Sequence, residues 1–359
     1  KWAVEDINKE GGIYVKELGR KLPVRVIMYD DKSDPATAIS NFEKLVLDDK
    51  VDFMLCSLAG PAESLPPIAE KYKIPMVGTI YTMEMREGGY KWTFSTFFDA
   101  RGECTAFLEW LKTYPEELRP KRIGVLEWLD PLAKEYAVVG REWLDKYGYN
   151  VVYRASFEPG ADPTPYIMKC KELDVDAVWG LPTPPDAVSI IKRAKELGYS
   201  PKAWLFTRGT AVAYFGAALG RDADYVFVTP PEGIGIGNPR WEADHPGAKE
   251  LIERYRKETG KEPFIVGKFY SAMMIYKDAI ERAGSLDREK VREALAKTDL
   301  MTPQGHVTFT PCPPGHYWAE HIEHMMAGQW RNGTIEIIWP PKWKTADAVY
   351  PAPTWEERG

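Results

Sequence analysis

The sequence predicts an α/β protein built from two doubly wound sheets. Strand-like and helix-like segments alternate along most of the chain, which favours parallel sheets covered by helices on both faces. The 359 residues exceed one domain of roughly 100–200 residues and indicate two domains. Apolar residues make up 44% and charged residues 28%, a composition typical of a folded chain and not of a disordered one.

The N-terminal elements begin with a helix and a strand. Apolar residues at Trp2, Ala3 and Ile7 have helical spacing, and this helix is expected to end at Gly11-Gly12. The β-branched run PVRVIMY at 23–29 predicts a strand, which two aspartates follow. The next elements are expected to be a helix over 35–47, a strand over 51–56, a helix over 61–72, and strands over 74–78 and 92–96.

A second series of alternating elements begins at residue 101. Its helices are expected over 101–112, 132–147, 163–172 and 185–197. Its strands are expected over 122–126, 150–155, 177–180, 203–206 and 225–229. Because most of these strands precede a helix, the series predicts a second parallel sheet.

The C-terminal part combines longer helices with a hairpin. Helices are expected over 245–259, 263–283 and 287–298, and strands near 306–309 and 318–326. Asn332-Gly333 lies between the apolar runs 325–330 and 335–339, as the two-residue turn of a β-hairpin does.

Composition excludes several classes of protein. The net charge of −6, without a block of basic residues, gives no electrostatic footprint for a nucleic acid. No apolar stretch approaches the roughly 20 residues that a bilayer span needs. The four cysteines form no CxxC pair, so they indicate neither a zinc site nor a redox motif.

The sequence also lacks the signatures of common catalysts. It contains no GxSxG elbow, Walker A loop, HExxH or EF-hand motif. His316, His321 and His324 lie near two glutamates, which would suit a metal, but strand residues 321 and 324 would point to opposite faces. We therefore expect solvated histidines, with no metal and no cofactor.

Aromatic and charged residues follow several predicted strands at their carboxyl ends, where open α/β sheets bind ligands. Tyr81, Trp128 and Phe206 are such aromatics, and either ligand contact or packing between domains explains them. Arg208 follows the strand 203–206, so its side chain either points into the ligand crevice or lies on the surface.

Several segments together resemble one family in their order and spacing. They are AVEDINKEGGI, VRVIMYDDKSDPATAI, FxPGAD at 157–162, AKELG at 194–198 and GxVTF at 305–309. The chain thereby resembles the type I solute-binding proteins of ABC importers, in the branched-chain amino-acid (Leu/Ile/Val-binding) subfamily. The resemblance implies two Rossmann-like α/β lobes joined by three crossovers, a small-molecule ligand held between the lobes, delivery to a membrane permease, and no catalysis.

The resemblance also implies where the lobes begin and end. Lobe 1 is expected to comprise residues 1–97 and 231–310, and lobe 2 residues 98–230 and 311–359. The family's first strand and first ligand loop should precede Lys1 and are missing from this sequence. The family is periplasmic or extracytoplasmic, and a removed N-terminal segment would carry the signal peptide and any membrane anchor.

In the first lobe, the resemblance assigns the ligand carboxylate to Ala59-Gly60 at the start of a helix. The hydroxyl residue that the family has there is absent, so backbone N–H groups would hold the acid. The family's next ligand residue matches Thr82, with Ile80 and Tyr81 where smaller residues are usual. These two residues predict a narrower or more aromatic pocket.

In the second lobe, the resemblance points to three positions. Two tyrosines of the family fall at Leu132, beside Trp128, and near Thr183. The family's acidic residue for the α-ammonium of the substrate falls at Arg208, which would repel an ammonium. The resemblance with this departure therefore predicts a carboxylate ligand that lacks an α-ammonium.

Three functions remain open. The first is a non-catalytic binding protein for a small carboxylate, such as an aromatic or hydrophobic acid that packs on the strand-end aromatics. The second is a binding protein for branched-chain or other amino acids, with Arg208 turned to solvent and Glu127 or Asp130 receiving the ammonium. The third is an α/β hydrolase-like enzyme that uses Glu127, Asp130 or a histidine.

Overall fold

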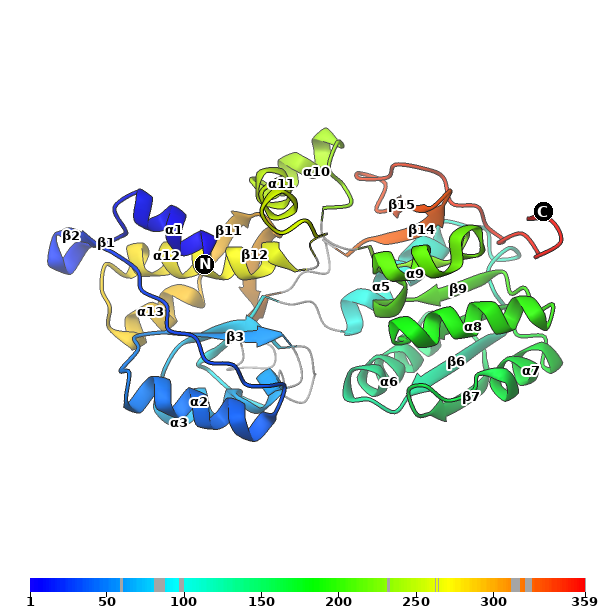
Figure 1. Ribbon diagram of the computed structural model, residues 1–359, viewed down its shortest axis with the longest axis horizontal. Coiled ribbons are helices and arrows are strands. Elements are labelled where there is room, and N and C mark those ends of the chain that lie inside the picture. Colours follow the sequence, from blue (N-terminus) through cyan, green and yellow to red (C-terminus); the bar gives the residue numbers. More distant parts are fainter. Residues whose placement is uncertain are drawn as a thin grey trace. The chain divides into compact units, whose positions relative to one another are not determined.

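The chain forms two compact units, each built around its own sheet. The computed structural model describes residues 1–58, 61–80, 88–96, 100–230, 233–261, 263, 265–310, 317–319 and 325–358 (Figure 1). Unit 1 comprises Lys1–Asp99, Asp244–Glu258 and Ile265–His324, and unit 2 comprises Ala100–Ala243, Thr259–Phe264 and Met325–Gly359. This division rests on contacts within the chain and does not test hinges. The limits of the two lobes and the three crossovers between them therefore stay a prediction.

Unit 1 contains a six-stranded sheet with the order β11-β12-β13-β5-β4-β3. Its strands are β3 (Met54–Leu58), β4 (Met76–Thr79), β5 (Thr93–Ser95), β11 (Asp299–Thr302), β12 (Gly305–Thr310) and β13 (Tyr317–Ala319). β3, β4, β5 and β13 are parallel, whereas β11 and β12 pair antiparallel. Its helices are α1 (Trp2–Lys9), α2 (Pro35–Leu47), α3 (Pro66–Tyr72), α11 (Ala248–Thr259), α12 (Val266–Ala283) and α13 (Arg288–Leu295), with short 3₁₀ turns η1 (Lys16–Leu18) and η2 (Pro61–Ser64).

Helices cover both faces of this sheet. On one face, α2 and α3 form a core with Met54, Cys56 and Met76. On the other face, α1, α12 and α13 form a core with Val77 and Phe94. Met76 and Val77 are successive residues of β4, so their side chains point to opposite faces. The sequence expectation of a doubly wound sheet is confirmed here.

The N-terminal region differs from the sequence expectation. A small hairpin, β1 (Ile13–Val15) with β2 (Arg20–Leu22), follows α1 and was not predicted. The predicted strand at 23–29 is wrong, because residues 23–30 pair with no other strand in the described part of the chain. A β-branched run becomes a strand only where a neighbour supplies hydrogen bonds, and here Val26 and Met28 are 41% and 76% exposed.

Unit 2 contains a seven-stranded sheet with the order β15-β14-β10-β9-β8-β6-β7. Its strands are β6 (Ile123–Trp128), β7 (Val151–Phe157), β8 (Ala177–Gly180), β9 (Ala203–Phe206), β10 (Phe227–Val228), β14 (Ala327–Arg331) and β15 (Thr334–Trp339). Its helices are α5 (Ala100–Lys112), α6 (Pro131–Lys146), α7 (Thr164–Glu172), α8 (Pro184–Glu196), α9 (Ala213–Leu219) and α10 (Pro239–Asp244), with 3₁₀ turns η3 (Arg208–Thr210) and η4 (Gly220–Ala223).

The C-terminal strands correct one prediction and confirm another. The single strand expected over 318–326 is wrong, because β13 ends at Ala319 in the sheet of unit 1 and β14 begins at Ala327 in the sheet of unit 2. The predicted hairpin is confirmed: β14 and β15 pair antiparallel, and Asn332 and Gly333 turn with φ of 50° and 81°. Such angles are those of a two-residue type I′ turn.

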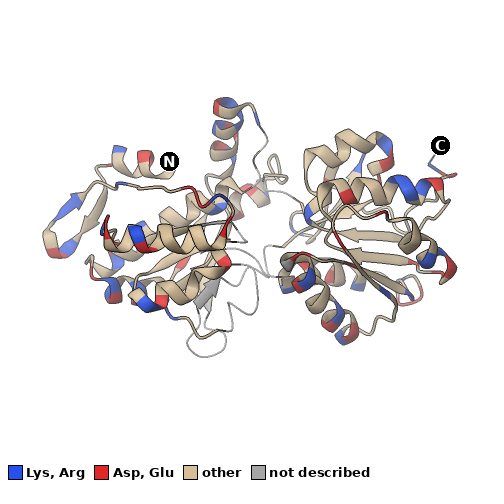
Figure 2. Ribbon diagram, turned by 60° about the horizontal axis from the view of Figure 1, so that its bottom comes forward, with Lys and Arg blue, Asp and Glu red and all other residues tan. Residues whose placement is uncertain are grey.

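Charged residues of both signs occur along the helices of each unit (Figure 2). Many form pairs one helical turn apart, such as Arg282 with Asp278 and Lys169 with Glu172. No helix of the described residues is long and apolar enough to span a bilayer. His316, His321 and His324 lie outside the described residues.

Candidate functional site

Three polar residues meet at one edge of the sheet in unit 2. β6, β8 and β9 are parallel neighbours, so their carboxyl ends lie side by side. Asp130 follows β6 as the N-cap of α6, Thr183 follows β8 as the N-cap of α8, and Arg208 follows β9. This edge is where open α/β sheets bind their ligands.

Arg208 makes a bidentate ion pair with Asp130. Its NH1 and NH2 lie 3.0 Å from Oδ1 and Oδ2 of Asp130, and both side chains are about a quarter exposed. Nε donates to the carbonyl of Pro182 at 3.2 Å, and NH2 also donates to the carbonyl of Leu181 at 2.8 Å. Within the described residues, these bonds occupy four of the five guanidinium N–H groups and leave one on NH1.

The backbone at Arg208 is unusual. Its φ is 43°, in the left-handed region that few non-glycine residues adopt. The next residue must be small, because a Cβ on Gly209 would lie 2.5 Å from the carbonyl oxygen of Pro182 and 2.6 Å from that of Thr183. The close approach of η3 to the loop after β8 therefore holds the Arg208 guanidinium against Asp130.

The sequence does not predict that these groups meet. It leaves two orientations open for Arg208, toward a ligand or toward solvent, and it offers Asp130 or Glu127 as the acid that receives an ammonium. In the structure each acid has an arginine partner: Asp130 has Arg208, and Glu127 has Arg141, with NH1 of Arg141 3.1 Å from Oε2. The carbonyls of the loop after β8 were missed, because nothing in a sequence marks a backbone acceptor for a distant side chain.

Thr183 and Leu132 begin the helices beside this pair. The hydroxyl of Thr183 accepts from the Asp186 backbone N–H at 3.4 Å and donates to Oδ2 of Asp186 at 2.5 Å. Oδ1 of Asp186 in turn accepts from the N–H of Gly160 at 2.8 Å. Leu132 is half-buried in the first turn of α6. Ligand contact by either residue stays a prediction.

The two predicted aromatics of unit 2 lie in its core. Trp128 and Phe206 are fully buried and contact each other edge-to-face, with ring centroids 6.5 Å apart. Trp128 also packs on Phe157 at 4.7 Å, and a Cβ on Gly180 would lie 2.8 Å from its ring. Both rings belong to the last residues of their strands, β6 and β9, and pack in the core; stacking on a ligand stays a prediction.

The predicted residues of unit 1 are described only in part. Ile80 follows β4 and is buried, and its backbone N–H and C=O both bond to the hydroxyl of Ser95, at 3.2 and 2.8 Å. Ala59, Gly60, Tyr81 and Thr82 lie outside the described residues.

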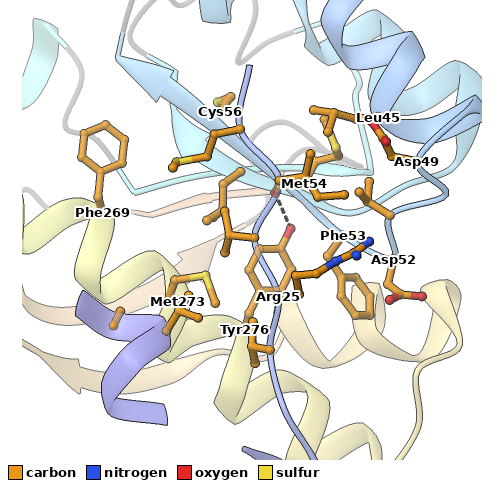
Figure 3. A pocket seen from close by; sticks show the side chains of 18 of the residues that line it. Arg25, Leu45, Asp49, Asp52, Phe53, Met54, Cys56, Phe269, Met273 and Tyr276 are labelled. Carbon is orange, nitrogen blue, oxygen red and sulfur yellow. Dashed lines mark hydrogen bonds between the residues drawn. The ribbon is translucent and has the colours of Figure 1, made fainter. Parts of the chain in front are cut away.

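Unit 1 also contains a cavity that sequence reasoning did not predict. Its volume is about 770 Å³, and residues 23–29, β3, α2 and α12 line it. Figure 3 shows Phe269 and Met273 of α12 together with Met54 and Cys56 of β3 around this space. Burial raises the pKa of the Cys56 thiol to about 12, so the thiol is neutral and unreactive at physiological pH.

Comparison with known proteins identifies the family. A model of the family described as "Periplasmic binding protein" matches residues 1–334, which is most of the chain. The chain belongs to this family. Its two α/β units have the fold of type I periplasmic binding proteins, as the sequence resemblance implied.

Individual relatives are distant. The leucine-, isoleucine-, valine-, threonine- and alanine-binding protein of Pseudomonas aeruginosa is 25% identical over 315 residues, which cover 86% of this chain and 78% of that protein. The Leu/Ile/Val-binding protein of Escherichia coli is 26% identical over 236 residues, covering 64% of this chain and 60% of that protein.

Solved structures share the fold. A leucine binding protein from Thermotoga maritima superimposes with a TM-score of 0.72 at 22% identity, over 93% of this chain and 91% of that chain. A branched-chain amino acid transporter substrate binding protein from Streptococcus pneumoniae, in complex with isoleucine, has a TM-score of 0.72 at 20% identity over 94% and 92% of the two chains.

Proposed function

We propose that this chain is the extracytoplasmic solute-binding component of an ABC importer. It binds a small carboxylate, releases it unchanged and passes it to a membrane permease. The observation that carries the proposal is the family match, which runs over residues 1–334 and so includes most of both units. The named relatives and neighbours, which are binding proteins, add support.

Arg208 carries the proposal about the ligand. A left-handed non-glycine residue costs about 1–3 kcal/mol, and such strain is found where a side chain must be aimed. A solute carboxylate that replaces Asp130 would keep the bidentate geometry of the guanidinium, and the partly exposed Asp130 would keep its hydrogen bond from the Ala133 N–H. We therefore propose an acid that lacks an α-ammonium, with an aromatic or hydrophobic body.

The other proposed contacts follow from the family resemblance. Backbone N–H groups of Ala59-Gly60 and the hydroxyls of Thr82 and Thr183 would provide polar contacts. The apolar contacts would come from Ile80, Tyr81, Trp128, Leu132 and Phe206.

An amino acid is the second candidate, and Asp130 favours it. Because its carboxylate balances the charge of Arg208, an α-ammonium near the pair would not be repelled as it would be by a lone arginine. The relatives are named for leucine, isoleucine and valine, which fits the same reading.

Titration calorimetry with matched ligands tests both candidates. Leucine is compared with 4-methylpentanoate, its analogue without the ammonium, and phenylacetate serves as the aromatic acid. The first proposal expects the acids to bind at least tenfold more tightly than leucine, and the second expects the reverse order. Mass spectrometry of the ligand after incubation checks that it is unchanged, and steady product formation would support a hydrolase-like enzyme instead.

Two variants locate the site. Arg208→Met should weaken acid binding at least tenfold, which is about 1.4 kcal/mol. Arg141→Met is the matched control, since it removes the arginine of another ion pair of similar exposure, the pair with Glu127 that links α6 to β6. Equal losses of binding in the two variants would count against Arg208 as a ligand residue.

A further inference from the structure

The 3₁₀ turn η3, which begins with Arg208, is too short to hold its own shape. Its three residues are closed by a bond from the Thr210 N–H to the carbonyl of Thr207 at 3.3 Å, and by one from the Ala211 N–H to the carbonyl of Arg208 at 3.3 Å. The φ of 43° at Arg208 is strained, and such a conformation persists only where the surrounding structure fixes it. Neighbours outside η3 must therefore keep the guanidinium in place.

Trp330 of β14 is one of these neighbours. Its indole Nε1 donates to the carbonyl of Thr210 at 2.8 Å, and the two residues are 5% and 0% exposed. A bond buried in this way is costly to lose, because the carbonyl cannot turn to water instead. The loop after β8 is the other neighbour, through the close approach of Gly209 to its carbonyls. Since β9 lies between β8 and β14 in the sheet, η3 is held from two sides.

Trp330 is itself fixed through both its backbone and its ring. Its N–H donates to the carbonyl of Val226 at 3.0 Å, and its carbonyl accepts from the Tyr225 N–H at 2.8 Å. The ring packs on Phe215 of α9 with centroids 5.8 Å apart, and a Cβ on Gly216 would lie 2.5 Å from it. The indole N–H therefore has one fixed direction, which is what a support for a strained turn requires.

We propose that Trp330 is a positioning residue for Arg208. By fixing η3 at Thr210, it keeps Arg208 in the conformation that aims the guanidinium, and it thereby determines how strongly the protein prefers a carboxylate ligand. The inference rests on the proposed function, in which Arg208 receives the carboxylate of the solute. A residue that only packs in the core behaves differently, because its loss lowers stability but leaves the carboxylate preference of the folded molecules unchanged.

The first test needs no ligand. In protein labelled with an NMR isotope on arginine nitrogens, the exchange of the Arg208 Nε–H with water is followed, and its signal is assigned by its absence from Arg208→Met. Trp330→Phe keeps an aromatic ring against α9 and removes the indole N–H. We expect the Arg208 Nε–H to exchange at least tenfold faster in this variant. Unchanged exchange would overturn the proposal, whichever solute the protein binds.

Trp204→Phe is the matched control. Trp204 is fully buried in β9 of the same sheet, and its Nε1 has no hydrogen-bond partner among the described residues. This variant removes the same part of a ring without removing a hydrogen bond, so exchange at Arg208 should stay within twofold of the wild-type value. Equal acceleration in both variants would mean that any loss of packing loosens Arg208, which contradicts a specific role of Trp330.

A second pair of variants decides the question if Trp330→Phe does not fold. Gly216→Ala keeps the indole but pushes on its ring, and alanine favours the helix α9. Gly140→Ala is its control, because a Cβ there would lie 2.6 Å from Nε1 of Trp179, which has no partner within the described part of the chain. Only Gly216→Ala should speed exchange at Arg208, and equal exchange in the two variants would overturn the proposal.

The last test separates this proposal from the proposed function. Calorimetry compares 4-methylpentanoate with 4-methylpentanamide, which has the same body without the charge. The wild-type protein should bind the acid at least tenfold more tightly than the amide; Trp330→Phe should lose most of this preference, and Trp204→Phe should keep it. A preference that survives in Trp330→Phe contradicts the proposal. A wild-type protein that does not prefer the acid rejects the proposed ligand class instead, and exchange at Arg208 then decides whether Trp330 holds it.

Discussion

At the scale of single residues, the Arg208–Asp130 ion pair places a positive and a negative side chain together at the carboxyl edge of the sheet in unit 2. Both side chains are partly exposed, so solvent screens their attraction and the pair contributes only about 0–1 kcal/mol to stability. The orientation of the guanidinium is nevertheless well defined, because Arg208 also donates hydrogen bonds to the carbonyls of Leu181 and Pro182. A change at this pair should therefore alter binding more than folding.

Asp130→Asn separates the two candidate ligand classes. Asparagine caps a helix as well as aspartate does, so α6 should keep its N-cap. The variant releases the charge of Arg208, so a carboxylate ligand should bind about tenfold more tightly in calorimetry. An amino-acid ligand whose ammonium contacts Asp130 should bind more weakly, and that result would reject the acid proposal.

The sequence predicted the position of Arg208 at a strand end but not its partner. A strand followed by Arg-Gly indicates a residue at the carboxyl edge, because that inference uses only local order along the chain. The contact with Asp130 joins residues 78 positions apart, which no local pattern contains. In the same way, the burial of Trp128 and Phe206 depends on neighbours from other strands.

At the scale of elements, local signals predicted helices well and strands less well. The helix at 35–47 begins and ends as expected, because Asp34 caps it and a proline follows at its first position. The run 23–29 has the composition of a strand but lacks a pairing partner, so composition alone misassigned it. The short helices α9 and α10 were missed, because six or seven residues give too few turns for a periodic pattern.

Gly333→Ala tests the predicted hairpin. A left-handed residue with a Cβ costs about 1–2 kcal/mol, and Gly333 has a φ of 81°. Apart from the two chain neighbours, no atom of the described residues would lie within 4 Å of a Cβ at this position, so the cost comes from the backbone and not from a clash. We therefore expect the free energy of unfolding in urea to fall by about that amount. Thr334→Ala, in the first residue of β15, is the control for a side-chain change beside the turn and should alter the free energy less.

Tyr147 links α6 to α5 and should give the stability a pH dependence. Burial alone would raise the pKa of Glu109, but hydrogen bonds from Tyr147 and Lys112 lower it. Because the folded-state pKa is below the unfolded one, this contribution is present above the unfolded pKa of about 4.3 and is lost as the pH falls through the folded-state pKa.

Tyr147→Phe should therefore lower the melting temperature at pH 7, and the difference from the wild-type protein should shrink as the pH falls toward 3. Tyr149→Phe is the control, because its buried hydroxyl has no hydrogen-bond partner among the described residues. A Tyr147→Phe effect of equal size at both pH values would mean that packing, not the charge of Glu109, is responsible.

At the scale of the whole molecule, the chain is two cores that fold around separate sheets. The alternation of strand and helix was sufficient to predict this class, because each sheet is built mostly from neighbouring segments of the chain. The points where the chain passes from one unit to the other were harder to predict. β13 ends at Ala319 and β14 begins soon after, at Ala327, yet the two strands belong to different sheets.

Ligand binding should reveal whether both units contribute to the site. At a hundredfold excess over Kd, a ligand that binds only the folded protein adds about 2.7 kcal/mol to the free energy of unfolding. In scanning calorimetry, a ligand that contacts both units should raise the transitions of both, because neither can unfold without releasing it. Gly333→Ala identifies the transition of unit 2, since that residue lies in its sheet. If the bound acid moves only that transition, the ligand is held by unit 2 alone, around Arg208, and the proposed contacts at Ala59-Gly60 and Thr82 are wrong.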